Sequence, residues 1–233
     1  MTTIASNLQA VRDAISAAAN QAGRHADDVS LLAVSKTFPA EAVREAYLSG
    51  QTRFAESYVQ EALDKIAVLQ DLAIEWHYIG PIQSNKTRAI AKKFSWVHSV
   101  DRFRIAERLS GQRPAHLPPL QVCLQVNISR EASKSGVAPD EADELARAIA
   151  KLPNLTLRGL MAVPAPADDF TAQRVPFARL RELRDRLNQH GMHMDTLSMG
   201  MSHDFAAAIA EGATMVRIGT AIFGDRFYEK ESK

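Results

Sequence analysis

The 233-residue sequence lacks the features that mark a secreted, membrane-spanning or nucleic-acid-binding protein. It has a single cysteine, so no internal disulfide framework can form, which fits a reducing compartment. No apolar run approaches the length of a membrane span, and the N-terminus has no charged start followed by an apolar block. Lys and Arg (28) nearly balance Asp and Glu (27), so no global field draws the chain to nucleic acid or to an anionic membrane. We therefore expect a cytoplasmic protein whose partner is small or locally recognised.

The sequence also lacks a G-x-G-x-x-G turn after a strand and shows no break in composition that would separate two domains. What it does have is a regular alternation of short apolar segments with amphipathic ones, after a leading helix that starts near Ile4 and ends at Gly23. The expected strands are 29–34, 53–56, 75–79, 96–100, 120–128, 155–163, 196–199 and 215–218. Strict alternation indicates a parallel sheet, and eight units close into a barrel. We predict one α/β domain over residues 1–233, a (β/α)8 TIM barrel with an extra N-terminal helix.

Lys36 stands at the C-terminal end of the first expected strand, where barrels of this kind place their functional loops. A lysine in a pocket loses solvation of its charged form, which lowers its pKa and frees an amine that can form a Schiff base with an aldehyde. A lone lysine at a strand end is more often a solvated surface residue. The interpretation of Lys36 therefore depends on what else lies at the barrel mouth.

The loops after the seventh and eighth strands carry Gly200 with Ser202 and Gly219 with Thr220. Glycine lets the main chain approach an anion closely, and a hydroxyl at a helix start donates to a phosphate oxygen. These loops are the commonest phosphate site of the fold. Ordinary tight turns, with Ser202 as a helix cap, are the alternative.

A phosphate cup facing a lysine amine indicates pyridoxal 5'-phosphate (PLP), which carries both a phosphate and an aldehyde. Arg217 lies at a strand end, two residues before Gly219, and is placed to donate to the ring nitrogen of PLP. The alternative is that Arg217 forms an ion pair at the barrel rim. A barrel enzyme that binds a phosphorylated sugar, with Lys36 as its nucleophile, would use the same groups.

Six blocks of the sequence together resemble the pyridoxal phosphate homeostasis protein family. They are AVSKTFP at 33–39, WHYIGPIQSNK at 76–86, NISREASKSG at 127–136, LRGLMAVP at 157–164, LSMGMSHDF at 197–205 and VRIGTAIFG at 216–224. The resemblance implies a single PLP-binding barrel like that of alanine racemase, without established enzymatic activity and with a role in vitamin B6 homeostasis. It implies that Lys36 carries PLP as a Schiff base and that Arg217 faces the pyridine nitrogen. It also implies that Ser202, Gly219 and Thr220 hold the phosphate.

Four further positions are considered beside the expected site. The family commonly reads G-E-N-Y where this chain has residues 55–58, so Ser57 offers a shorter hydroxyl in place of a ring-side amide. Lys134 is either a second aldehyde-reactive amine or a solvated loop lysine. His77 is expected to be a satisfied histidine inside the barrel, and the role of His203 stays open.

The related racemases use two opposed bases, the cofactor lysine and a tyrosine that a partner subunit supplies through a second, all-β domain. This sequence ends at Lys233, directly after the eighth unit, so we expect that domain to be absent and the cavity mouth to be open to water. We expect no catalytic residue and no metal site. The resulting hypothesis is a monomeric PLP carrier that limits free PLP and serves apo PLP-dependent enzymes as recipients. The alternative is a weak PLP-dependent amino-acid racemase or decarboxylase.

Overall fold

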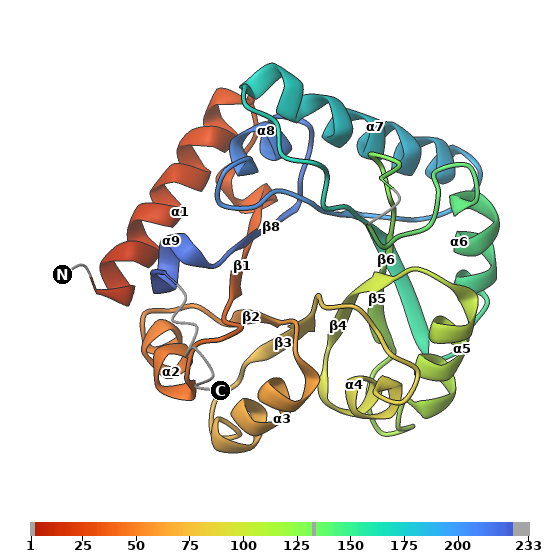
Figure 1. Cartoon of the computed structure of the whole chain (residues 1–233), viewed down its shortest axis with the longest axis horizontal. Coiled ribbons are helices and arrows are strands. Elements are labelled where there is room, and N and C mark those ends of the chain that lie inside the picture. Colours follow the sequence, from red (N-terminus) through yellow and green to blue (C-terminus); the bar gives the residue numbers. More distant parts are fainter. Residues whose placement is uncertain (1–2, 132–133, 226–233) are drawn as a thin grey trace, which may run out of the picture.

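The computed structural model describes residues 3–131 and 134–225, and within them a closed parallel barrel forms the centre of the molecule (Figure 1). Its strands follow one another around the barrel in chain order and run β1 Ser30–Val34, β2 Arg53–Glu56, β3 Glu75–Tyr78, β4 Trp96–Val100, β5 Leu120–Gln125, β6 Leu155–Met161, β7 Thr196–Ser198 and β8 Met215–Ile218. The last strand pairs with the first, with Leu32 opposite Arg217. The predicted (β/α)8 barrel is confirmed.

Helices surround the barrel and cover the outer face of its sheet (Figure 1). They run α1 Ile4–Gln21, α2 Ala40–Leu48, α3 Val59–Val68, α4 Thr87–Lys93, α5 Phe103–Gln112, α6 Ala142–Ala150, α7 Phe170–Gln189, α8 Phe205–Ala210 and α9 Thr220–Phe223, with a 3-10 turn at Ala26–Asp28. None of these helices is long and apolar enough to cross a membrane in the described part of the chain.

The predicted N-terminal helix is α1, and it packs against the last elements of the barrel, α8 and α9. It starts with a capping box in which the Thr3 side chain accepts from the main-chain N–H of Ser6. It ends just before Gly23, whose φ of 68° is the left-handed conformation that favours glycine. Asn7 Nδ2 then donates to the carbonyl oxygen of Ile222 at 2.9 Å. The helix therefore joins the two ends of the described chain.

The largest difference between a predicted and an observed strand end is at β5, which ends at Gln125 instead of residue 128. Asn127 causes this, because its side-chain amide donates to the carbonyl oxygens of Glu131 and Lys134 and folds the chain into a turn. Residues 132 and 133 of that loop lie outside the described residues. The next helix, α6, starts at Ala142.

The interior of the barrel is partly polar. Apolar side chains fill most of it, among them Leu32, Met215 and Met161. Beside them lie His77 and His98, which are fully buried. Buried polar groups require hydrogen-bond partners, and those of the two histidines extend toward both ends of the barrel, to Ser198 on one side and to Glu75 on the other.

Candidate functional site

A cavity of about 610 Å³ opens at the C-terminal end of the barrel, and the predicted site residues all line it. Lys36 reaches it from the end of β1, Ser202 from the loop after β7, and Arg217, Gly219 and Thr220 from β8 and the turn that follows. Its volume lies in the range of small-ligand pockets. Residues that the sequence analysis did not single out complete the wall, and these are Val34, Ile79, Met161, Val163, Met201 and Asp225. Most of these residues lie at or just after the C-terminal end of a strand, which is where the cavity of such a barrel opens.

The turn that carries Lys36 is held in an unusual backbone conformation. The next residue, Thr37, has φ of 70°, in the left-handed region that β-branched residues avoid. Its main-chain N–H donates to Oε1 of Glu61 at 2.6 Å, which compensates for the strain. The direction in which Lys36 leaves the strand is therefore set by a carboxylate on α3.

A buried lysine fixes the other side of the same turn. Lys65 Nζ donates to the carbonyl oxygen of Ser35 at 2.7 Å, to Oε1 of Glu56 at 2.7 Å and to Oε1 of Glu61 at 2.6 Å. Burial raises the pKa of Glu56, and the Lys65 charge opposes that rise. Ser35 Oγ donates to the same Glu56 oxygen at 2.7 Å, so the residues on both sides of Lys36 join one buried network.

Four residues that line the cavity, Ser202, His203, Gly219 and Thr220, are together called the cup. Within the described residues, no hydrogen bond uses their main-chain N–H groups, nor the hydroxyls of Ser202 and Thr220. N–H groups without a protein acceptor are available to an anion, and the hydroxyls add donors for a group with several oxygens. The cup fits a phosphate, as the sequence analysis expected.

Two glycines allow the loops after β7 and β8 to pack closely, Gly219 against β1 and Gly200 against α8. A Cβ on Gly219 would lie 2.9 Å from the carbonyl oxygen of Val34, and one on Gly200 would lie 2.6 Å from Cβ of Ala208. Gly200 also has φ of 93°. Its carbonyl oxygen accepts from the N–H of Arg217 at 2.9 Å, which ties the loop after β7 to β8.

Arg217 lies almost fully buried at the base of the cavity. Its Nη1 donates to Oγ of Ser198 at 2.9 Å and its Nη2 to the carbonyl oxygen of Ala162 at 2.9 Å. Both partners are neutral, so the predicted alternative of a rim ion pair is wrong. Burial lowers the pKa of Arg217 to about 10, which still leaves the guanidinium charged at neutral pH. A fixed cationic donor thus faces the cavity from below.

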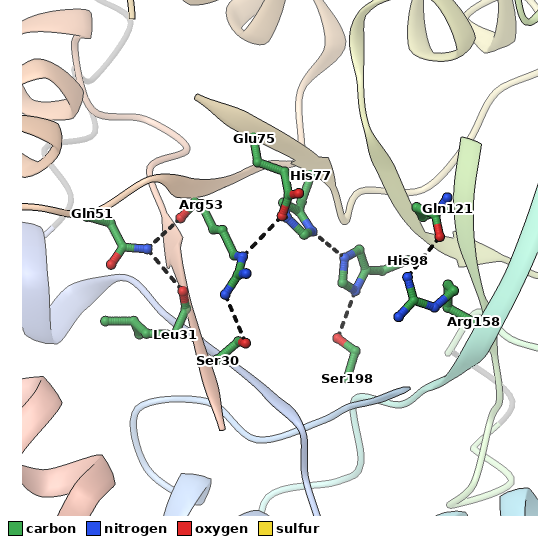
Figure 2. Close-up of polar contacts among 10 residues, drawn as sticks. All are labelled: Ser30, Leu31, Gln51, Arg53, Glu75, His77, His98, Gln121, Arg158 and Ser198. Atoms are coloured by element: carbon green, nitrogen blue, oxygen red, sulfur yellow. Dashed lines mark hydrogen bonds and ion pairs between the residues drawn. The ribbon is translucent and has the colours of Figure 1, made fainter. Parts of the chain in front are cut away.

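Ser198 continues into the polar interior of the barrel. Figure 2 shows its hydroxyl beside His98, which in turn meets His77, and that ring reaches the carboxylate of Glu75. His77 is therefore a satisfied interior histidine, as predicted. Glu75 belongs to a second cavity of about 600 Å³ at the opposite end of the barrel.

Comparison with known proteins identifies the family of the chain. The model of the alanine racemase N-terminal domain matches residues 6–227. A pyridoxal phosphate homeostasis protein of Pseudomonas aeruginosa is 62% identical over 228 residues, which cover 98% of each chain. This chain belongs to the pyridoxal phosphate homeostasis protein family. Among solved structures, that of PipY from Synechococcus elongatus without PLP aligns over 95% of this chain and 100% of its own. Its TM-score is 0.86 and its sequence is 37% identical. The same protein with PLP bound has a TM-score of 0.84 at 36% identity.

Ser57 lines the cavity as a buried residue. Its carbonyl oxygen accepts from the hydroxyl of Tyr78 at 3.2 Å, so the turn after β2 is fixed even without the longer amide. Lys134 pairs with Glu131 at 3.0 Å and donates to the carbonyl oxygen of Val163 at 3.3 Å. That engagement favours the loop-lysine alternative.

His203 lies at the cavity wall with an exposed side chain. Cys123 is fully buried in a cluster with Trp96 and Met161, and burial raises the pKa of its thiol to about 12. No cluster of three or more potential metal ligands occurs among residues 3–131 and 134–225.

Proposed function

We propose that this protein binds PLP and takes part in PLP homeostasis, with Lys36 as the residue that holds the cofactor. The observation that carries the proposal is the cup of unused N–H groups, which lies in one cavity with the amine of Lys36. The names of its relatives and the PLP-bound structure of PipY support the same function.

When bound, PLP supplies an aldehyde, a phosphate and a pyridine nitrogen. Lys36 would hold the aldehyde through its amine as a Schiff base. Ser202, Thr220 and the N–H of Gly219 would donate to the phosphate. Arg217 would donate to the ring nitrogen, and its positive charge would disfavour protonation of that nitrogen.

We further propose that the protein stores and releases PLP without catalysis. A racemase needs a second base opposite the lysine, and no tyrosine is among the described residues that line the cavity. An unprotonated ring nitrogen also makes PLP a weaker electron sink. The alternative, a weak racemase or decarboxylase, finds its best candidate base in His203, the imidazole at the cavity wall.

The absorption spectrum of freshly purified protein, before and after borohydride, tests the binding proposal. We expect a visible band that disappears on reduction, and peptide mapping should find the pyridoxyl group on Lys36. The Lys36→Ala variant should lose the band, with Lys134→Ala as the matched control that keeps it. A wild-type spectrum with no chromophore after incubation with PLP refutes the proposal and favours the phosphorylated-sugar alternative.

Chiral chromatography of amino acids after prolonged incubation separates carrier from enzyme. A carrier leaves each enantiomer unchanged, whereas turnover that disappears in both Lys36→Ala and His203→Gln establishes the enzyme. Decarboxylation is followed in parallel as released CO₂.

The remaining elements of the proposal concern organisation and partners. We propose one domain over residues 1–233, a monomer in the cytoplasm, and apo PLP-dependent enzymes as recipients of PLP. The buried, reduced Cys123 is compatible with a reducing compartment. Light scattering gives the oligomeric state. Activation of an apo-enzyme by the PLP-loaded protein, compared with the same concentration of free PLP, measures transfer.

A further inference from the structure

A continuous line of hydrogen bonds crosses the barrel interior from the cofactor cavity to the opposite end. Arg217 Nη1 lies 2.9 Å from Ser198 Oγ, which lies 2.8 Å from Nδ1 of His98. His98 Nε2 lies 2.9 Å from Nδ1 of His77, and His77 Nε2 lies 2.9 Å from Oε1 of Glu75 (Figure 2). The side chains of the two histidines, Ser198 and Arg217 are almost completely buried, whereas Glu75 is 40% exposed.

The chemistry of these groups allows one arrangement of protons when both histidines are neutral. A carboxylate only accepts, so His77 carries its proton on Nε2 and presents Nδ1 as an acceptor. His98 must then donate from Nε2, which leaves its own Nδ1 to accept from the hydroxyl of Ser198. The oxygen of Ser198 in turn accepts from Arg217, which only donates. Every donor along the line therefore points toward Glu75.

Neutral histidines agree with their surroundings. Burial lowers the pKa of His77, and burial together with the nearby His77 and Arg217 lowers the pKa of His98 far below its ordinary value. Trp96 stacks on the His77 ring, with centroids 5.5 Å apart. The line thus has a fixed direction, with the Arg217 cation at one end and the Glu75 anion at the other.

We propose that Glu75, at the opposite end of the barrel, positions Arg217 through Ser198, His98 and His77 and so adjusts the hold of the cavity on PLP. Hydrogen bonds that share a direction polarise one another, and the low dielectric of the interior strengthens that effect. The charge of Glu75 makes Ser198 Oγ a better acceptor, which keeps the guanidinium in one orientation. The inference rests on the proposed contact between Arg217 and the ring nitrogen of PLP.

Glu75→Gln is the decisive variant, because the amide oxygen still accepts from His77 and only the charge is lost. We expect the visible band of the PLP-loaded protein to shift and the PLP dissociation constant to rise by about fivefold, the equivalent of one net hydrogen bond. Ser198→Ala interrupts the line next to Arg217. In that background Glu75→Gln should cause no further change, since coupled residues give non-additive effects. Independent, additive effects of the two substitutions overturn the proposal.

Glu75 also accepts from Arg53 at 3.2 Å, so the loss of that ion pair needs a matched control. Asp195→Asn provides it, because Asp195 lines the same end cavity and binds Arg158 at 2.5 Å without joining the line. Asp195→Asn should leave the band and the dissociation constant unchanged. An equal shift in both variants assigns the effect to the general charge of that end and refutes the specific path.

Long-range ¹H–¹⁵N spectra of the PLP-free protein test the line itself. Both His77 and His98 should appear as neutral tautomers protonated on Nε2, and Ser198→Ala should perturb the Nδ1 signal of His98. Tautomers protonated on Nδ1 overturn the inference. Because this measurement needs no cofactor, failure of PLP binding with the expected tautomers refutes the proposed function and leaves the hydrogen-bond line standing.

Discussion

Replacing Lys65 by methionine removes the charge from the network behind the Lys36 turn while keeping most of the side-chain volume. Lys65 is 5% exposed and its partner Glu56 is fully buried. The substitution leaves the carboxylate of Glu56 without its cation, and it also removes a donor from the carbonyl oxygen of Ser35.

Breaking a buried ion pair from one side costs about 3 to 5 kcal/mol, because the remaining charge stays desolvated. With a typical urea dependence of about 2 to 3 kcal/mol per molar, the unfolding midpoint should fall by about 1 to 2.5 M. Trp76 and Trp96, both buried in the barrel wall, report unfolding by fluorescence.

Arg44→Met is the matched control. Arg44 binds Asp71 at a similar distance of 2.7 Å, but the two side chains are 38% and 56% exposed. Surface pairs contribute about 0 to 1 kcal/mol, so this variant should unfold close to the wild-type midpoint. Equal midpoints for the Lys65 and Arg44 variants would refute the reasoning.

The pH dependence of the Lys65→Met variant identifies Glu56 as the source of the loss. Burial raises the pKa of Glu56 in the folded state, and removal of Lys65 raises it further. Between the unfolded and folded pKa values the native state binds more protons, so stability falls as pH rises through that window. The loss in the free energy of unfolding of Lys65→Met, relative to the wild type, should therefore shrink on acidification. Adding Glu56→Gln to the variant should remove this pH dependence.

Three other substitutions or reagents test separate features. Cys123, with a pKa of about 12 in the core, should react with a thiol reagent at pH 8 only after unfolding, as followed by absorbance. Glu211→Gln should lower stability in urea by about 2 kcal/mol, because this 4% exposed carboxylate binds two arginines of α7. Gly219→Ala should weaken PLP binding at least tenfold in a titration, since the new methyl group meets the Val34 carbonyl oxygen. Gly111→Ala, with open space around it, should bind PLP normally.

Much of the fold follows from the order of apolar segments. The bounds of β2, β4 and β8 agree with those predicted, since turn residues or charges mark their ends. The site residues came together for a geometric reason, because strand ends of a parallel barrel converge on one mouth. No knowledge of side-chain contacts was needed to bring Lys36 and Arg217 into one cavity.

The hydrogen-bond networks could not be predicted in the same way. The strand that contains His98 is buried on both faces, so its sequence does not tell which side chains enter the barrel. Helical spacing predicts a pair between Arg181 and Asp185, yet Arg181 binds Glu211, directly after α8, and Asp185 binds Arg184. The partner of each of these side chains depends on which helix or strand packs beside it, and that is decided only in the closed barrel. The short α9 was also missed, because four residues carry no periodicity.

The pairing of β8 with β1 has a consequence for folding. It places the lysine of the first strand and the arginine of the last strand in one cavity, although they are separated by most of the sequence. Contacts of such long sequence separation form late, because loop closure has to precede them. The cavity therefore does not exist until the seam between the first and last strands closes. A barrel that is still open between β1 and β8 therefore does not bind the cofactor. Cofactor binding then serves as a measure of barrel closure.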